Sequence, residues 1–335
     1  MKNIELPRRV VVGDDAVKQV AEVCKDLGLK KNPLVISDTQ THKVAGKKVA
    51  GLLGVESMII EPSNDFSGIL DYIKKKKINF ILGVGGGKVI DTAKYTSFLS
   101  EIPFLSIPTS AAHDGIASLL VSLKGEKPIS VKARSPVAVV ADTRIIKKAP
   151  HRLLASGCGD AISNYTAVLD WELAHKEKGE YYGDYAAALS MMSAQIVMCC
   201  AEKVNSDVSI AVEALISSGV AICIADSSRP CSGSEHLFSH ALDIICPNPA
   251  LHGEQCGVGT IMMAYLHGDD KWLKIRESLK TLGAPTTAEE LGIEDKYIIK
   301  ALTIAHTLRD RYTILGDGLS RKDAVEIAKS TGVIS

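Results

Sequence analysis

Short apolar runs alternate with segments of helical spacing along residues 1–150. Arg9–Val12, Leu34–Ile36 and Phe80–Leu82 are typical of short buried strands, since they are apolar, partly β-branched and only a few residues long. Further strands are expected at Ser57–Ile60, Phe104–Ile107 and Val137–Val140, and helices at Ala16–Leu29, Lys43–Leu53, Phe66–Lys77 and Val89–Leu99. Strands that alternate with helices predict βαβ units and a doubly wound, mostly parallel sheet.

The pattern changes after Pro150, where strand-like runs disappear and long segments of helical periodicity take over. We predict helices over Leu153–Glu177, Tyr182–Lys203, Asp207–Asp226, Ser234–Ile245, Glu254–His267, Trp272–Leu282, Lys296–Tyr312 and Arg321–Ser330. A chain of 335 residues is long for one core. We therefore predict two domains, an α/β domain over residues 1–150 and an all-helical domain over residues 151–335, with the active site in the cleft between them.

Charge and composition exclude several classes of protein. Lys and Arg total 39 and Asp and Glu also total 39, which argues against a nucleic-acid binder. No apolar stretch is long enough to cross a membrane, and the N-terminus lacks the apolar core of a signal peptide. The eight cysteines form no C-x-x-C pair, and residues such as Cys199, Cys200 and Cys223 read as buried thiols. We expect a cytoplasmic protein without a membrane span.

A glycine-rich loop, Gly83-Val-Gly85-Gly86-Gly87-Lys88, follows a predicted strand and opens a predicted helix. Glycines let the backbone approach phosphate closely, and a helix N-terminus offers N–H groups to it. The loop follows about the fourth strand, whereas the usual dinucleotide motif follows the first, and it lacks the spacing of a P-loop. A plain strand-to-helix turn is the alternative.

Two further strand ends carry polar residues. Asp38 closes a strand, where a carboxylate can bind the ribose of a dinucleotide or cap the next helix. Thr109 and Ser110 follow another strand and can donate to a phosphate or to the nicotinamide end of a cofactor. Asp114, in the same loop, can accept from a substrate hydroxyl. A capped turn is the structural alternative for this second loop.

Three histidines and a carboxylate have the composition of a metal site. His236 and His240 are four residues apart and share a helix face, and His252 follows 12 residues later. Asp160 follows Gly157-Cys-Gly and is expected to begin a helix. Three such ligands leave one or two positions open, as catalytic zinc requires. A histidine pair on a helix is, however, often an ordinary feature of a surface or core.

Several segments together resemble the iron- or zinc-dependent polyol dehydrogenase superfamily, which includes glycerol dehydrogenase and 3-dehydroquinate synthase. They are Gly85–Asp91, Ile107–Ser110, Val139–Thr143, Gly157–Asp160 and the two histidine segments, and they span nearly the whole chain in order. Thr109–Ser118 and Ser232–His240 are more specific, since they resemble the sn-glycerol-1-phosphate dehydrogenases that set the glycerol stereochemistry of archaeal ether lipids.

The resemblance implies a dehydroquinate synthase-like fold and NAD(P)H-dependent reduction of dihydroxyacetone phosphate to sn-glycerol 1-phosphate. It implies one zinc ion per subunit on Asp160, His236 and His252, and substrate contacts and catalysis by Asp114, Asp160 and His240. With Asp38, the expected NAD(P) contacts are Gly85, Gly86, Gly87, Lys88, Val89, Ile90, Asp91, Thr109, Ser110, Ala111, Ala112 and Ser118. Use of both NAD and NADP and a homo-oligomeric state are also implied.

Other functions stay open at this point. The main alternative is a glycerol or polyol dehydrogenase that acts on an unphosphorylated substrate. Nickel can replace zinc, because His and Asp ligands do not fix the metal. A dehydroquinate synthase-like lyase would need a denser basic cluster than the sequence shows, and a non-catalytic nucleotide-binding protein would not be expected to keep all three ligands. His113, Lys132 and Arg229 are candidate phosphate donors by position only.

Overall fold

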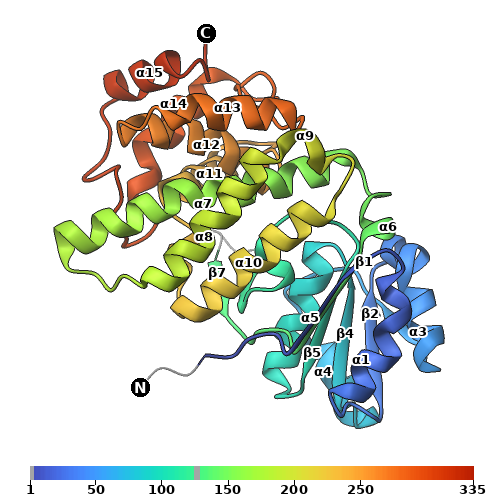
Figure 1. The fold of residues 1–335 in the computed structure, drawn as a ribbon. Helices are drawn as coiled ribbons and strands as arrows, with labels where there is room; N and C mark the ends of the chain where they lie inside the picture. The colour runs from blue at the N-terminus through green and yellow to red at the C-terminus, as the bar shows by residue number, and fades with distance from the viewer. Residues whose placement is uncertain (1–3, 124–128) are drawn as a thin grey trace.

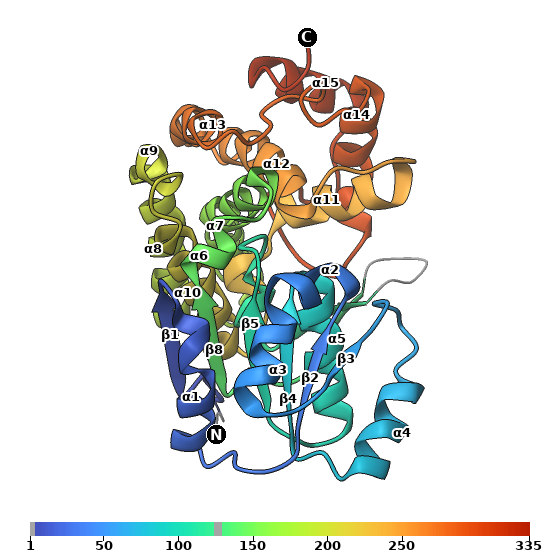
Figure 2. The same cartoon turned by 90° about the vertical axis from the view of Figure 1, so that its right-hand side faces the viewer.

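The computed structural model describes residues 4–123 and 129–335. A six-stranded sheet, in the order β1-β8-β5-β4-β2-β3, forms the core of the N-terminal half, and every neighbouring pair in it is parallel (Figures 1 and 2). Its strands are β1 Arg9–Gly13, β2 Pro33–Ser37, β3 Ser57–Ile59, β4 Phe80–Gly85, β5 Phe104–Pro108 and β8 Ala138–Asp142. The predicted doubly wound sheet is confirmed.

Helices cover both faces of this sheet, because successive strand residues point to opposite sides. On one face, helices α1 (Val20–Asp26) and α3 (Lys47–Leu53) pack on a cluster that includes Val35 and Leu82. On the other face, α4 (Ser67–Lys76) and α5 (Gly87–Leu99) pack on a cluster that includes Ile36 and Ile81. Shorter segments are η1 Ala16–Gln19, α2 Thr39–Thr41, the π-helical turn η2 His42–Gly46 and α6 Thr143–Ile146.

The C-terminal half is helical and lies beyond the carboxyl ends of the strands (Figure 2). Its helices are α7 His151–Lys178, α8 Asp184–Cys199, α9 Ala201–Val204, α10 Ser209–Ala225, α11 Ser234–Ile245, α12 His252–Leu266, α13 Lys271–Thr281, α14 Asp295–Ile304 and α15 Arg321–Ser330. Three short 3-10 turns, η3 Asp114–Ile116, η4 Arg229–Cys231 and η5 Ala305–Thr307, complete the elements. The predicted fold class, an α/β half followed by a helical half, is therefore confirmed, while the boundary at residue 150 stays a prediction.

Glycines set the spacing of the central helix pair, α7 and α12. A Cβ added to Gly159 would lie 2.2 Å from the carbonyl oxygen of Gly253, and one added to Gly253 would lie 1.9 Å from that of Ser156. A Cβ on Gly157 would lie 2.0 Å from the carbonyl oxygen of Ala111, in the loop after β5. The absence of side chains at these positions lets α7 approach both α12 and the sheet.

Several local predictions were wrong. Asp160 lies inside α7 and does not begin a helix; the glycines before it serve helix packing. The segment predicted as a helix to Tyr312 leaves α14 at Ile304. The hairpin of β6 (Leu120–Leu123) and β7 (Ile129–Lys132) was not foreseen. Cys199, expected to be buried, is exposed.

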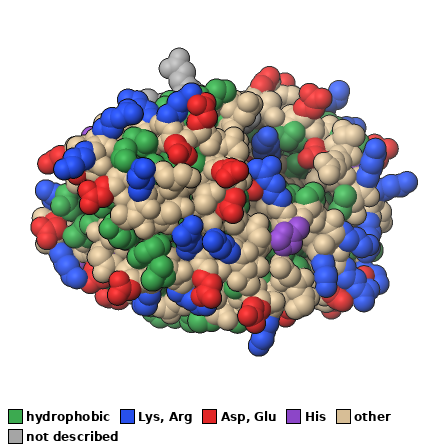
Figure 3. Space-filling model, turned by 90° about the horizontal axis from the view of Figure 1, so that it is seen from above, with side chains coloured by type: hydrophobic (Ala, Val, Ile, Leu, Met, Phe, Trp, Pro, Cys, Tyr) green, Lys and Arg blue, Asp and Glu red, His purple; other side chains and the backbone are tan. Residues whose placement is uncertain are grey.

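The surface agrees with the balanced composition of the chain. On the face shown in Figure 3, basic and acidic side chains are interspersed and form no extended area of one sign. None of the helices in the described ranges combines the length and the apolar character needed to cross a bilayer.

Candidate metal and dinucleotide site

A cavity of about 520 Å³ lies between the two halves of the chain. The sheet half contributes the start of α5, the loop after β5 and the β6–β7 hairpin. The helical half contributes α7, α11, α12 and the segment after η5. Of the predicted site residues, the cavity is lined by Gly87, Lys88, Asp91, His113, Asp114, Ser118, Asp160, His236, His240 and His252.

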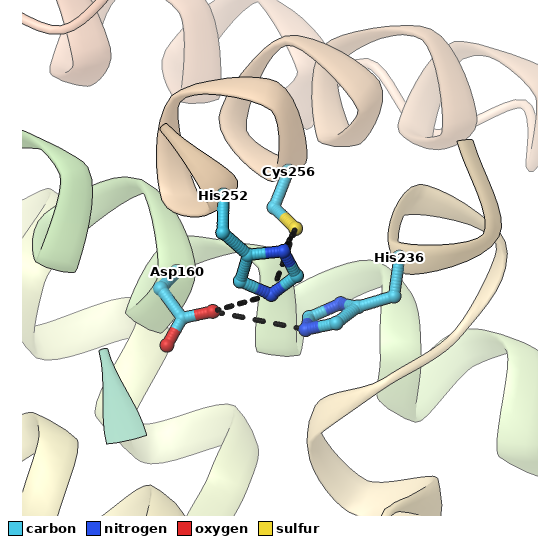
Figure 4. Close-up of side chains that lie close together, drawn as sticks. All are labelled: Asp160, His236, His252 and Cys256. Atoms are coloured by element: carbon cyan, nitrogen blue, oxygen red, sulfur yellow. Dashed lines mark hydrogen bonds and ion pairs between the residues drawn. The ribbon is translucent and has the colours of Figure 1, made fainter. Parts of the chain in front are cut away.

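Three helices bring the predicted metal ligands together (Figure 4). Asp160 Oδ1 lies 3.7 Å from Nε2 of both His236 and His252. Ligand atoms of these three residues and of Cys256 all lie within 4.8 Å of one another. Cys256 lies four residues after His252, on the same face of α12. Its position beside the predicted ligands was not foreseen. A single cation can therefore reach all three predicted ligands.

Hydrogen bonds from the Nδ1 atoms of His236 and His252 orient both imidazoles so that Nε2 faces the place where the ligand atoms converge. His236 Nδ1 lies 2.9 Å from a carboxylate oxygen of Glu235, so the proton belongs on Nδ1 and the lone pair on Nε2. His252 Nδ1 lies 3.1 Å from Ser239 Oγ, whose hydroxyl donates to Gln255 at 2.6 Å. Because that hydroxyl proton is used, Ser239 accepts from Nδ1 of His252 and leaves its Nε2 as the metal-facing acceptor.

The electrostatics of this cluster favour a cation. Burial lowers the pKa of His236 to about 3 and that of His252 well below its usual value, so both rings offer a lone pair at neutral pH. Burial raises the pKa of Asp160 to about 7, and the charge of Glu235 adds to the rise. Burial and the charge of Asp160 raise the pKa of Asp114 to about 7 as well. A divalent ion would stabilise the ionised carboxylates, and the residues therefore fit a metal centre.

The glycine loop opens a helix of 13 residues, α5, directly at the cavity. Its N-cap is Gly86, in an extended conformation and without a side-chain cap, so the first N–H groups of the helix are left for a ligand. A Cβ on Gly87 would lie 1.9 Å from Nε2 of His113, which explains the need for glycine there. Lys88 is exposed at the rim.

The other predicted dinucleotide residues divide by burial. Val89 and Ile90 are buried in the core between α5 and the sheet, so only their backbone can reach a cofactor. Asp91 Oδ2 accepts a bond of 3.2 Å from the backbone of Ser122, on the hairpin. Thr109, Ser110, Ala111 and Ala112 lie in the loop after β5, and Ser118 lies deeper in the cavity wall. Their contacts with NAD(P) stay predictions.

Asp38 acts as a helix cap. Its carboxylate accepts from the backbone N–H of Thr41 at 2.7 Å and from the hydroxyl of Thr41 at 2.9 Å, while that hydroxyl oxygen accepts from the N–H of Asp38. This is the second of the two roles considered for Asp38. A ribose contact by the same carboxylate stays a prediction.

His240 and Asp114 flank the metal cluster. The ring of His240 stacks at 5.9 Å, centroid to centroid, on that of His252. Its Nε2 lies 3.2 Å from Nη2 of Arg309, and its Nδ1 is buried without a hydrogen-bond partner among the described residues. Both Asp114 and His240 line the cavity, as expected of substrate contacts.

The positional candidates for phosphate binding are mostly elsewhere. Lys132 forms an exposed ion pair with Asp226 at 2.5 Å, and Arg229 is buried and pairs with Glu180. Neither residue lines the cavity. His113 does line it. Sequence reasoning missed Arg309, which does line it. The alternating charges of Leu308-Arg-Asp-Arg-Tyr312, inside an expected helix, were the available signal.

A buried lysine was also missed. Lys94 is fully buried and donates to the carbonyl oxygens of Gly115 and Leu120, at 2.8 and 2.7 Å. Burial lowers its pKa, and Asp91, 3.6 Å away, opposes that shift. Lys94 thus fixes the loop that carries Asp114 against α5. The spacing of Asp91 and Lys94, three residues apart on one face of a predicted helix, was the signal for it.

Comparison with known proteins shows the family of the chain. Residues 11–150 match a family model described as iron-containing alcohol dehydrogenase. The chain is 53% identical to a protein of Methanosarcina mazei named glycerol-1-phosphate dehydrogenase, with NAD(P)+ as the stated cofactor, over 100% of this chain and 97% of that one. A protein of Pyrococcus furiosus with the same name is also 53% identical, over 100% of both chains. The chain belongs to the glycerol-1-phosphate dehydrogenase family.

Membership in this family confirms the resemblance found in the sequence and makes the chain an oxidoreductase. The fold is shared more widely. A glycerol dehydrogenase structure from Schizosaccharomyces pombe superimposes with a TM-score of 0.82 at 21% identity, covering 99% of this chain and 90% of that one. At that identity the likeness concerns the fold alone.

Proposed function

We propose that the protein reduces dihydroxyacetone phosphate to sn-glycerol 1-phosphate with NAD(P)H, and so supplies the glycerophosphate backbone of archaeal ether lipids. The observation that carries this proposal is the convergence of Asp160, His236 and His252 in a cavity that also receives the N-terminus of α5. Full-length identity to archaeal members of the family supports the same reaction.

In the proposed site Asp160, His236 and His252 hold a zinc ion. When bound there, the ion supplies Lewis-acid polarisation of the substrate C2 oxygen. Glu235 and Ser239 keep the two imidazoles in the tautomer that offers Nε2. The open positions around the three ligands are what a catalytic centre requires, as opposed to a closed structural one.

The N-terminus of α5 binds the pyrophosphate of the cofactor through the backbone N–H groups that follow Gly86. The loop from Thr109 to Ala112 and the wall at Ser118 hold the remainder of the dinucleotide. A cofactor held there would have its nicotinamide in the same cavity as the metal ligands, and it would supply the hydride for C2 of the substrate.

Reduction of a carbonyl also consumes a proton. The carboxyl of Asp114 lines the cavity beside the metal ligands, so it is the group that we expect to pass that proton to the substrate oxygen. His240 contacts the substrate from the opposite side of His252. It accepts a hydrogen bond from Arg309 and stays neutral, since burial lowers its pKa to about 2.

We place the reaction in the cytoplasm and expect a homo-oligomer. The direct test is oxidation of NADPH or NADH with dihydroxyacetone phosphate, run beside unphosphorylated dihydroxyacetone, with stereochemical analysis of the product. Turnover of the phosphate ester to sn-glycerol 1-phosphate, lost on chelation and restored by zinc, is the expected result. Preferred turnover of dihydroxyacetone would instead indicate a glycerol dehydrogenase, and full activity without metal would contradict the zinc site.

A further inference from the structure

Two arginines next to the metal cluster form no ion pair with a carboxylate of the residues that the structure describes. Arg309 lines the cavity, and its Nη2 donates to Ser130 Oγ at 3.0 Å and to His240 Nε2 at 3.2 Å. Arg311 lies behind the same wall and donates to the carbonyl oxygen of Ser232 and, at 2.7 Å, to Ser228 Oγ. The hydrogen bonds that these guanidinium groups make within the described residues thus all go to neutral oxygen and nitrogen atoms, although the charges of Glu235 and Glu180 also act on Arg311.

Two other arginines of the helical half differ in this respect. Arg229 pairs with Glu180, and Arg152 pairs with Glu254 at 2.6 Å. Within residues 4–123 and 129–335, no carboxylate oxygen lies within 4.0 Å of a guanidinium nitrogen of Arg309 or Arg311. Burial lowers the pKa of Arg311 to about 10, with further lowering by the neighbouring Arg229 and Arg309. Desolvated positive charge of this kind favours the binding of an anion.

We propose that Arg309 binds the phosphate group of the substrate, with Arg311 as a second positive charge behind it. The hydroxyls of Ser130, Ser228 and Ser232 line the cavity around the two guanidinium groups and complete the polar surface. This inference rests on the proposed function, and it identifies the substrate class as a phosphate monoester of a small ketone or alcohol.

This phosphate subsite lies within the length of a small substrate from the metal ligands. One imidazole, that of His240, separates the guanidinium of Arg309 from the ring of His252. A three-carbon ester can therefore set its carbonyl at the metal ligands and its phosphate at Arg309. The pyrophosphate of the cofactor has its own donors at the start of α5, on the other half of the chain, and does not need this pair.

The position of Arg309 is also fixed. The segment that carries both arginines is tied to the helical core, because the backbone N–H of Ile314 donates to Asp170 Oδ1 at 2.7 Å. Asp170 also accepts from the backbone and hydroxyl of Ser234, each at 2.6 Å, at the start of α11. The helix that bears His236 and His240 and the segment that bears Arg309 thus share one anchor, which keeps the phosphate subsite in register with the metal ligands.

The test compares Arg309→Gln with the parent protein on two substrates, dihydroxyacetone phosphate and dihydroxyacetone. We expect kcat/KM for the phosphate ester to fall on the order of 100-fold. With dihydroxyacetone, where only the bond from Arg309 to His240 is lost, kcat/KM should fall at least about tenfold less. Arg309→Lys keeps the positive charge without the planar guanidinium. Its kcat/KM for the phosphate ester should lie between those of the parent protein and of Arg309→Gln. Arg144→Gln is the matched control, because Arg144 is exposed and pairs with Asp14 and Asp15 far from the cavity.

Titration calorimetry with inorganic phosphate, on metal-loaded protein saturated with NAD+, gives a readout that does not depend on activity. Phosphate should bind the parent protein and Arg144→Gln alike, and at least about tenfold more weakly to Arg309→Gln. Unaltered phosphate binding in Arg309→Gln, or an equal loss on both substrates, would overturn the proposal. If the parent protein preferred dihydroxyacetone, the proposed function would fail, and the calorimetry would still decide whether Arg309 binds an anion. Thermal unfolding verifies that each variant is folded.

Discussion

The backbone N–H of Asp114 donates a hydrogen bond of 2.9 Å to Oδ2 of Asp160. Asp114 follows β5 of the sheet half and Asp160 lies on α7 of the helical half, so this bond joins the two halves at the metal cluster. It leaves Oδ1 of Asp160 facing His236 and His252. The loop that carries a proposed substrate contact therefore also orients a proposed metal ligand.

Metal affinity should depend on pH through Asp160. Because burial raises its pKa to about 7, the metal-free site holds a proton there below pH 7, and the metal must displace it. His236 contributes no proton in this range, since its pKa is lowered to about 3. We expect zinc affinity to weaken about tenfold per unit as pH falls from about 7 to 5, and to level off at higher pH. Calorimetry in buffers of different ionisation enthalpy counts the protons released when zinc binds. A zinc affinity that does not change between pH 5 and 7 would contradict the assignment of this proton to Asp160.

Ser239→Ala should weaken metal binding without removing a ligand. Ser239 accepts a hydrogen bond from Nδ1 of His252 and donates one to Oε1 of Gln255, so its loss frees the ring to change tautomer and orientation. Loss of such a partner typically costs about 10–100-fold in metal affinity. Competition with a chromogenic chelator measures the change. Ser206→Ala, at an exposed hydroxyl that bonds only its own turn, is the control and should bind zinc like the parent protein.

His240→Ala separates catalysis from metal binding. His240 lies one helical turn from His236 and bonds Arg309, but it is outside the group of converging ligand atoms. We expect kcat to fall on the order of 100-fold, the range for loss of a positioned polar group, with the zinc content per subunit unchanged. Elemental analysis beside steady-state kinetics tests this. A matching loss of zinc would make His240 a ligand.

Gly253→Ala should destabilise the helix pair that forms the site. The new Cβ would lie 1.9 Å from the carbonyl oxygen of Ser156, so α7 and α12 must separate, at a cost of about 3 kcal/mol. Gly51→Ala is the opposite case, since nothing lies within 4 Å of the added Cβ on α3. There alanine should stabilise the protein by about 0.5–1 kcal/mol. Denaturant unfolding of both variants measures the two free energies, and equal effects would contradict the packing argument.

The sequence by itself determined the order of the sheet strands and of the main helices, and it brought forward the residues that line the proposed site. Apolar runs such as Phe80–Leu82 predicted buried strands correctly, because a strand covered on both faces leaves little choice of residue. His236 and His240 were correctly placed on one helix by their spacing alone. The glycine loop was correctly placed after the fourth strand, because glycines permit the tight turn from β4 into α5.

Only the tertiary structure decided which distant residues meet. Asp160 reaches His252 because glycines on α7 and α12 remove the side chains between the two helices. In the sequence, the two glycines before Asp160 had instead indicated the start of a helix. Asp38 proved to be a cap, since its nearest donors are those of Thr41. Arg309 approaches His240 through a segment that departs from the expected helix after Ile304. Local periodicity reports which face of an element is buried, whereas partners across elements depend on packing distances that no short window of sequence contains.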